Sequence, residues 1–364
     1  MKKTGVYLHI PFCRRKCPYC DFFSVPDSSL FDDYTDALCS RIEYYGGKLQ
    51  RTADTLYFGG GTPSLIGEER LCRIAAAAVK SFGIGREAEV TVEVNPEKQD
   101  IDFHRLLEGG FNRLSIGLQS ADDNELRLLG RLHDSEEAEK CIERAKSSGF
   151  ENISLDLMLA TPSQTPDSLV RSIEFCASHG AKHISAYILK IEPGTPYSRI
   201  RDRLSLADDD GQAELYELAC DKLEEYGYRQ YEISNFAVPG FESRHNLKYW
   251  HDEEYIGIGP SAHSFIDGKR FFCERSIERF MEGAVTDDGE GGGPEEYIML
   301  GLRLTEGVTN KGFRERFGTD IPRRYYLAAE RYNKTGLLIA DSTGIRLTRK
   351  GFLVSNALIC EILD

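Results

Sequence analysis

The first two thirds of the chain alternate short apolar segments with longer amphipathic ones. The apolar segments are rich in Val, Ile, Leu and Tyr, and they predict β-strands at Gly5–Pro11, Thr55–Phe58, Glu89–Val94, Arg113–Leu118, Asn152–Leu159 and His183–Leu189. The amphipathic segments predict helices at Ser29–Tyr45, Gly67–Phe82, Asp100–Gly109, Ser135–Gly149 and Thr165–His179. Such alternation gives parallel strands joined by right-handed crossovers. Six units are too few for a closed eight-unit barrel, so the sequence predicts an open, partial (β/α)6 TIM-like barrel.

The last third of the chain does not continue this alternation. A helical run at Ala207–Gly227 leads into an irregular, aromatic-rich stretch at Tyr231–Lys269 and a glycine-rich linker at Gly283–Pro294. The segments after the linker predict a winged-helix-like α+β unit: helices at Glu295–Leu302, Gly312–Phe317 and Pro322–Thr335, a hairpin at Leu337–Leu347, and a final helix capped by Thr348. We therefore predict a barrel domain (1–230), a connecting segment (231–293) and a C-terminal domain (294–364).

Chemically distinctive residues fall where the predicted strands end. In parallel α/β folds the carboxyl ends of the strands meet at one edge, where active sites gather. The residues are Cys13, Cys17 and Cys20 after the first strand, Gly59-Gly-Gly-Thr-Pro63 after the second, Glu93 and Asn95 at the third, Gln119 and Ser120 at the fourth, Asp156 in the fifth, and Lys190 to Glu192 after the sixth. We expect a single site at this edge.

The three cysteines have the spacing C-x3-C-x2-C. Thiolates this close in sequence can converge on one metal centre within a single loop. A four-iron cluster held wholly by protein takes four thiolates, so three leave one iron open to another ligand. An open iron suits a sulfonium cofactor whose amino and carboxylate groups chelate the metal. A zinc ribbon would need a second Cys or His pair, and a disulfide would suit a small secreted domain.

Composition excludes several other classes of protein. The net charge of −14 opposes non-specific binding to nucleic acid. No apolar run approaches the length of a membrane span, and the chain does not start with an apolar secretory segment. Three of the ten cysteines are clustered and the others are scattered in apolar or helical settings, which is typical of a reducing compartment. We expect a cytoplasmic protein that is not an integral membrane protein.

The cysteine segment resembles the radical S-adenosylmethionine (SAM) superfamily. Its flanks, Tyr7-x-His-Ile-Pro-Phe-Cys and Cys20-Asp-Phe22, are similar to the branch that holds oxygen-independent coproporphyrinogen III dehydrogenase (HemN-like) and the HemW family. The dehydrogenase has a further Cys where this chain has Phe22, and a longer segment ahead of its cluster. Both differences favour HemW. The segment Arg244-His-Asn-Leu-Lys-Tyr-Trp250 also resembles the His-Asn-x-x-Tyr-Trp hallmark of HemW proteins.

The resemblance implies a set of cofactor ligands. A 4Fe-4S cluster would bind Cys13, Cys17 and Cys20, and SAM would contact Tyr7, Tyr19, Gly61, Thr62, Glu93, Gln119, Arg131 and Asp156. In this arrangement the Arg131 guanidinium is suited to the SAM carboxylate, and Asp156 to the ribose hydroxyls. The residues alone leave other interpretations open: the glycine run can be a tight strand–helix turn, and Arg131 can be a solvated loop charge.

The resemblance also implies heme as a ligand, with His245 as the candidate axial residue. Neutral imidazole can ligate iron, and Trp and Tyr offer flat surfaces to a porphyrin; a lone His beside aromatics is more often structural. His251 and His263 are alternatives. The implied function is a heme chaperone that delivers heme to an acceptor protein, such as a membrane respiratory component. The alternatives are oxidative decarboxylation of coproporphyrinogen III, or radical SAM chemistry on an unrelated substrate. Heme at an exposed site would favour a homodimer.

Overall fold

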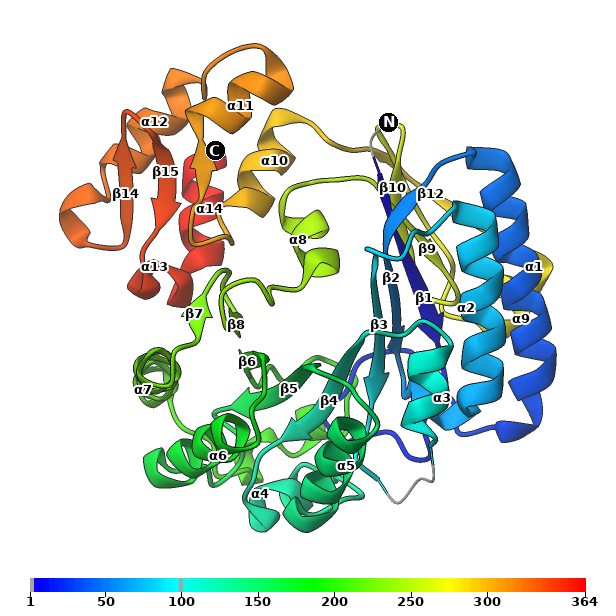
Figure 1. Cartoon of the computed structure of the whole chain (residues 1–364). Coiled ribbons are helices and arrows are strands. Elements are labelled where there is room, and N and C mark those ends of the chain that lie inside the picture. Colours follow the sequence, from blue (N-terminus) through cyan, green and yellow to red (C-terminus); the bar gives the residue numbers. More distant parts are fainter. Residues whose placement is uncertain (1–2, 98–100) are drawn as a thin grey trace.

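Six parallel strands form the frame of the molecule in this computed structural model, which describes residues 3–97 and 101–364. The strands lie side by side in chain order, and every neighbouring pair among them is parallel (Figure 1). They are β1 (Thr4–Ile10), β2 (Ala53–Gly60), β3 (Glu89–Val94), β4 (Arg113–Gln119), β5 (Asn152–Leu159) and β6 (His183–Ile188). The predicted partial barrel of six units is confirmed.

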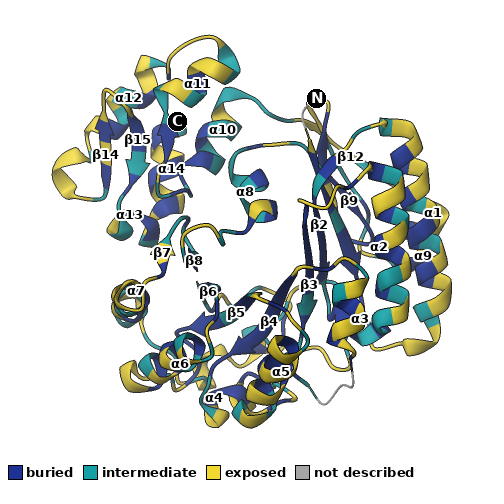
Figure 2. Cartoon of the chain, viewed as in Figure 1, coloured by how far each residue is buried: buried dark blue, intermediate teal, exposed yellow. Residues whose placement is uncertain are grey.

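Helices cover the outer face of these strands. The outward sides of the helices are exposed, whereas the strands are almost wholly buried (Figure 2). The helices are α1 (Phe31–Leu49), α2 (Glu68–Phe82), α3 (Phe103–Glu108), α4 (Asp123–Leu128), α5 (Ser135–Ser147), α6 (Pro166–Ser178) and α7 (Asp209–Glu225). Short 3-10 turns occur at Ser28–Leu30, Pro63–Ile66, Tyr197–Arg199 and Arg201–Arg203. The predicted helix start at Asp100 lies outside the described residues, as do residues 1 and 2 of the predicted barrel domain.

Later segments extend the sheet at both ends. The strand β9 (Tyr255–Ile258) pairs in parallel with β1 and begins an antiparallel run, while β8 (Asn235–Ala237) pairs with β6 at the opposite end. The added antiparallel strands are β10 (His263–Ile266), β11 (Lys269–Phe272), β12 (Thr286–Glu290), β8 (Asn235–Ala237) and β7 (Arg229–Gln230). The stretches predicted as irregular and as a linker are therefore partly regular. Their strands are short, and pairing with a neighbour rather than local residue preference decides their conformation.

The short helix α8 (Arg244–Trp250) packs against the parallel strands and fixes the connecting segment to the barrel. The backbone N–H groups of Arg244 and His245 donate to the two carboxylate oxygens of buried Glu89 on β3, at 3.0 Å each. The ring Nδ1 of His245 lies 2.8 Å from Oγ1 of Thr55 on β2. The first backbone N–H groups of a helix have no hydrogen-bond acceptor within the helix, and the Glu89 carboxylate supplies two acceptor oxygens.

The C-terminal domain combines helices with a small three-stranded sheet. Its helices are α10 (Pro294–Gly301), α11 (Asn310–Phe317), α12 (Arg323–Glu330), α13 (Arg349–Leu353) and α14 (Ser355–Leu363), and its strands, in sheet order, are β13 (Val308–Thr309), β15 (Gly344–Leu347) and β14 (Leu338–Asp341). The predicted hairpin is present, and the predicted final helix is two helices that meet at Val354. The predicted third helix is α12 followed by a 3-10 turn at Asn333–Thr335. The remaining helix, α9 (Ile277–Glu282), packs on α1.

The C-terminal domain contacts the barrel through α8. The helices α10 and α8 pack together, and the Arg303 guanidinium lies 5.8 Å from the ring centroid of Trp250. An isolated bridge between Glu232 and Leu304 adds a backbone connection. Among the described residues, none of the helices combines the length and apolar character that crossing a lipid bilayer demands.

We predict that Glu89→Gln destabilises the protein by about 1–3 kcal/mol, because an amide NH2 would then face two backbone donors in a buried position. Urea unfolding followed by circular dichroism measures the change. The exposed neighbour Glu87 provides the control, and Glu87→Gln should leave the midpoint within error. Equal midpoints for both variants would show that the Glu89 carboxylate does not hold α8.

Candidate functional site

A cavity of about 600 Å3 lies at the carboxyl edge of the parallel strands. It is lined by all three clustered cysteines and by residues from β2 through β6, including Tyr19, Gly61, Thr62, Glu93, Asn95, Gln119, Arg131 and Asp156. The structure therefore brings together the predicted cysteines and every predicted SAM contact except Tyr7. The Tyr7 side chain lies behind the cavity wall, where its hydroxyl is 3.1 Å from Nδ1 of His9 and its ring stacks on Tyr57.

The cysteine loop is pressed against the glycine run after β2. The N–H of Gly61 donates to the carbonyl of Ile10 at 2.9 Å, and the N–H of Thr62 to the carbonyl of Phe12 at 2.7 Å. A Cβ on Gly61 would lie 2.5 Å from the Phe12 oxygen, closer than side chains approach backbone. The run is thus required for the close approach of two loops, which also places Oγ1 of Thr62 3.6 Å from Sγ of Cys13.

The three thiols share one loop and one cavity. Among residues 3–97 and 101–364, no three Cys, His, Asp or Glu side chains converge to hold a single metal ion. Burial raises the pKa of Cys13 and of Cys20, and all ten cysteines are free.

Arg131 connects the cysteine loop to β3 and β4. Its Nη2 donates to Oδ1 of Asn95 at 2.7 Å and to the carbonyl of Gly117 at 2.9 Å, and its Nη1 lies 3.8 Å from Sγ of Cys17. Asn95 in turn donates to Oγ1 of Thr62 at 2.8 Å. The interpretation of Arg131 as a solvated loop charge is wrong, because its guanidinium is held inside the site.

Two carboxyl groups lie deeper along the strands. Glu93 accepts from the Tyr57 hydroxyl at 2.9 Å and from the Gly60 N–H at 3.1 Å, and Asp156 accepts from the Ser115 hydroxyl at 3.1 Å. Burial, followed by the nearby Asp156 charge, raises the pKa of Glu93 to about 7. Burial likewise raises the pKa of Asp156 to about 6. Near neutral pH both groups can therefore exchange a proton or accept hydrogen bonds from a ligand.

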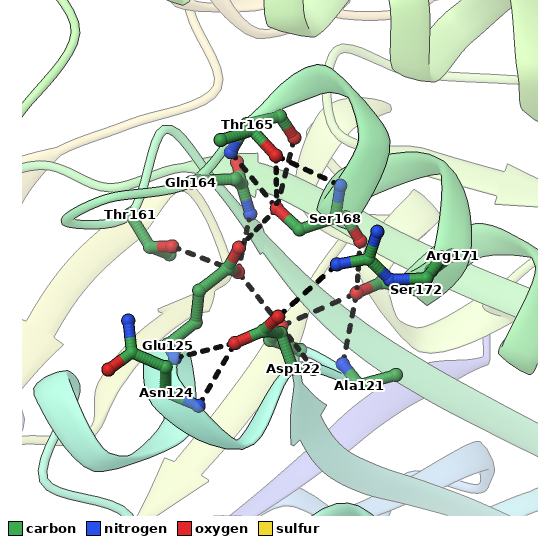
Figure 3. Close-up of polar contacts among 11 residues, drawn as sticks. Ala121, Asp122, Asn124, Glu125, Thr161, Gln164, Thr165, Ser168, Arg171 and Ser172 are labelled. Carbon is green, nitrogen blue, oxygen red and sulfur yellow. Dashed lines mark hydrogen bonds and ion pairs between the residues drawn. The ribbon is translucent and has the colours of Figure 1, made fainter.

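A buried carboxylate that the sequence analysis missed supports the ends of β4 and β5. Glu125 on α4 accepts hydrogen bonds from the hydroxyls of Ser120 (2.8 Å) and Thr161 (3.2 Å), from the Gln164 amide (3.0 Å) and from Ser168 (Figure 3). The strands end in left-handed backbone at Gln119 (φ 70°) and Ala160 (φ 55°), which is costly for residues other than glycine. The network offsets that cost and holds Gln119 on the cavity, where the Tyr187 hydroxyl donates to its Oε1 at 2.8 Å.

His245 lies outside the cavity and is 1% exposed. Its Nδ1 is 2.8 Å from Oγ1 of Thr55, its Nε2 is 2.8 Å from the Tyr249 hydroxyl, and its ring stacks on Tyr57 at 5.2 Å. Burial, with the positive charges of Lys248 and Arg113, lowers the pKa of His245 to about 3. The imidazole is thus neutral, with both nitrogens engaged. The side chains of His251 and His263 are 36% and 59% exposed.

Two family models match the chain. Residues 7–176 match the radical SAM superfamily, and residues 294–354 match the HemN C-terminal domain. Coproporphyrinogen III oxidase (HemN) from Escherichia coli, described as a radical SAM enzyme, has a similar structure, with a TM-score of 0.84 over 99% of this chain and 90% of that one. At 22% sequence identity this likeness establishes the fold alone.

Curated relatives extend the match to full length. The heme chaperone HemW of Bacillus subtilis is 36% identical, with 99% of each chain covered, and that of Escherichia coli is 35% identical, with 85% of each chain covered. Fold and site together define a radical SAM protein with a HemN-type C-terminal domain. Within that class, the chain belongs to the HemW family.

The raised pKa of Glu93 predicts a pH dependence of stability. Its ordinary value is 4.5 and its value in the fold is about 7, so the folded protein binds the proton more tightly than the unfolded chain. The stability contribution is therefore complete below pH 4.5 and is lost as pH rises through 7. We expect Glu93→Gln, which stays neutral, to become stabilised relative to the native chain over this interval. Denaturant unfolding at several pH values measures it, and a pH-independent difference would contradict the assignment.

Proposed function

We propose that this chain is a HemW-type heme chaperone, which binds heme and passes it to an acceptor protein while it carries a 4Fe-4S cluster and SAM. The observation that carries the proposal is the identity of 36% over 99% of the chain with a curated heme chaperone HemW. Phe22, 70% exposed beside Cys20, supports it, because the dehydrogenase branch has a cysteine at this place.

In this proposal Cys13, Cys17 and Cys20 are the cluster ligands, and their common loop on a common cavity fits that role. The cluster, when bound, supplies an electron to the SAM sulfonium. The protein itself would orient the ligand: Thr62 and the Gly61 backbone would face the methionine amino group, and Arg131 would face its carboxylate. Asp156, Glu93 and Gln119 would hold the ribose end, with Tyr19 beside the adenine. Tyr7, set behind the wall, would act through Tyr57 and His9.

Three histidines are candidates for the heme ligand: His245, His251 and His263. Ligation by His245 requires that its ring leave Thr55 or Tyr249, so heme capture there would be coupled to an opening of α8. His251 and His263 need no such opening. His251 borders a second cavity of about 970 Å3, between α8 and the first helices of the C-terminal domain.

The proposed function also implies an acceptor protein, an oligomeric state and a cellular location. The acceptor is a heme-requiring protein, such as a membrane respiratory component, and heme on an exposed residue would join two copies as a homodimer. The acidic composition supports a protein acceptor rather than nucleic acid. Ten free cysteines support a cytoplasmic location.

Titration with hemin tests the proposed function directly. We expect the purified chain to develop a Soret band, and we expect His245→Ala to weaken hemin affinity about tenfold or more if that imidazole is the ligand. His251→Ala and His263→Ala are the matched comparisons, and the variant that loses affinity identifies the axial residue. If the native chain binds no hemin, the chaperone proposal fails.

A second experiment separates the chaperone from the decarboxylating enzyme. The chain with reconstituted cluster is incubated anaerobically with SAM and coproporphyrinogen III, and porphyrinogens are separated by chromatography. We expect no protoporphyrinogen, because Phe22 stands where the dehydrogenase has its further cysteine. Conversion above the level of a Cys17→Ala control would favour the enzyme.

A further inference from the structure

Arg113, the first residue of β4, is a buried cation whose nearest compensating charges are the Glu93 and Asp156 carboxyl groups. It is 2% exposed, yet its side chain lines the cavity. Its Nε makes no hydrogen bond, and within residues 3–97 and 101–364 its guanidinium forms neither a hydrogen bond nor an ion pair. The site described above does not use it.

Leaving a buried charge unpaired is costly, so natural structures pair such groups or use them for binding. Buried Lys248 shows the usual arrangement, since its Nζ lies 2.9 Å from both Asp54 and Glu253. The two carboxyl groups on the strands beside Arg113 are committed elsewhere: Glu93 to Tyr57 and Gly60, and Asp156 to Ser115. Arg113 therefore does not hold the fold together through a direct contact.

Arg113 lies too deep to serve the end of SAM that binds the cluster. That end is marked by Gly117, whose carbonyl accepts from Arg131. Arg113 precedes Gly117 by four residues on the same strand, which separates their backbones by about 13 Å. Below Arg113 the barrel is closed by the start of α8, docked on Glu89. Arg113 thus stands at the floor of the cavity.

Besides the Glu93 and Asp156 carboxyl groups, uncharged polar side chains line the same cavity as Arg113. They are Ser115 on β4, Ser185 on β6, Asn235 on β8 and Asn246 on α8. Oδ1 of Asn235 is buried and, like Nε of Arg113, has no hydrogen-bond partner. A single guanidinium flanked by the Glu93 and Asp156 carboxyl groups suits a monoanion and disfavours a phosphate dianion.

We infer that Arg113 is the anchor of a second ligand site, below the SAM edge, that binds the carboxylate of an organic acid. The guanidinium fork would take the carboxylate in a bidentate pair, with the Asn235 and Asn246 amides beside it. Two sources share this chemistry: a small free carboxylic acid, and a propionate arm of a tetrapyrrole. The second source rests on the proposed function, and the first does not.

Thermal unfolding of the full chain with reconstituted cluster and SAM tests the site with a small acid. Sodium propionate should raise the unfolding midpoint of the native chain, and equal propionamide or sodium chloride should not. Arg113→Met should abolish the shift, and Arg113→Lys, which keeps the charge, should retain part of it. Arg86→Met, at an exposed arginine, should behave as the native chain. Without added acid, Arg113→Met should be at least as stable as the native chain.

Absorbance titrations with hemin and with hemin dimethyl ester test the tetrapyrrole source. We expect the native chain to prefer the free acid about tenfold or more, and Arg113→Met to lose that preference. If Arg113→Met differs from the native chain only with sodium propionate, the site binds a small acid. If the two differ only with hemin, the site binds a propionate group of a tetrapyrrole. If neither experiment distinguishes Arg113→Met from the native chain, the inference is overturned. Failure of the native chain to bind hemin overturns the proposed function, and thermal unfolding with sodium propionate then decides the inference.

Discussion

An open barrel of six parallel strands leaves its inner face to be completed by other parts of the chain. Here that face carries polar side chains at the level where the strands begin, and α8 covers them. Glu89 is the central contact, since one buried carboxylate receives two backbone N–H groups from the helix start. The connecting segment, the barrel and, through α10, the C-terminal domain are joined at this point. The depth of the cavity follows from it, because the docked helix forms its base.

The opposite edge of the barrel depends on close approach between backbones. Gly61 lets the loop after β2 hydrogen-bond to the cysteine loop, and Gly117 leaves room for Asn95 and Arg131, whose atoms a Cβ would meet at 3.0 and 3.2 Å. Side chains therefore face the cavity while main-chain contacts fix its outline. The three cysteines on one loop are thereby held beside residues contributed by five other parallel strands.

The elements that depend on the local hydrophobic pattern could be predicted from the sequence. The six strands, the covering helices and the gathering of Cys17, Glu93 and Asp156 at one edge follow from alternation and from strand direction. The roles of residues whose partners lie far away in the sequence could not be predicted. Glu125 reads as an ordinary acidic residue in a first helical turn, Arg113 as the start of a strand, and the motif around His245 gives no sign that the imidazole turns inward. The strands β9–β12 are too short to predict without their neighbours.

The Glu125 carboxylate has a consequence for how this protein can vary. Four side chains from the segments after β4 and β5 depend on the same two oxygen atoms. Groups that share one acceptor do not contribute additively, so a change at any of them alters the effect of changes at the others. Because the two loops share this acceptor, the tolerance of either loop to substitution depends on which side chains the other loop presents to Glu125.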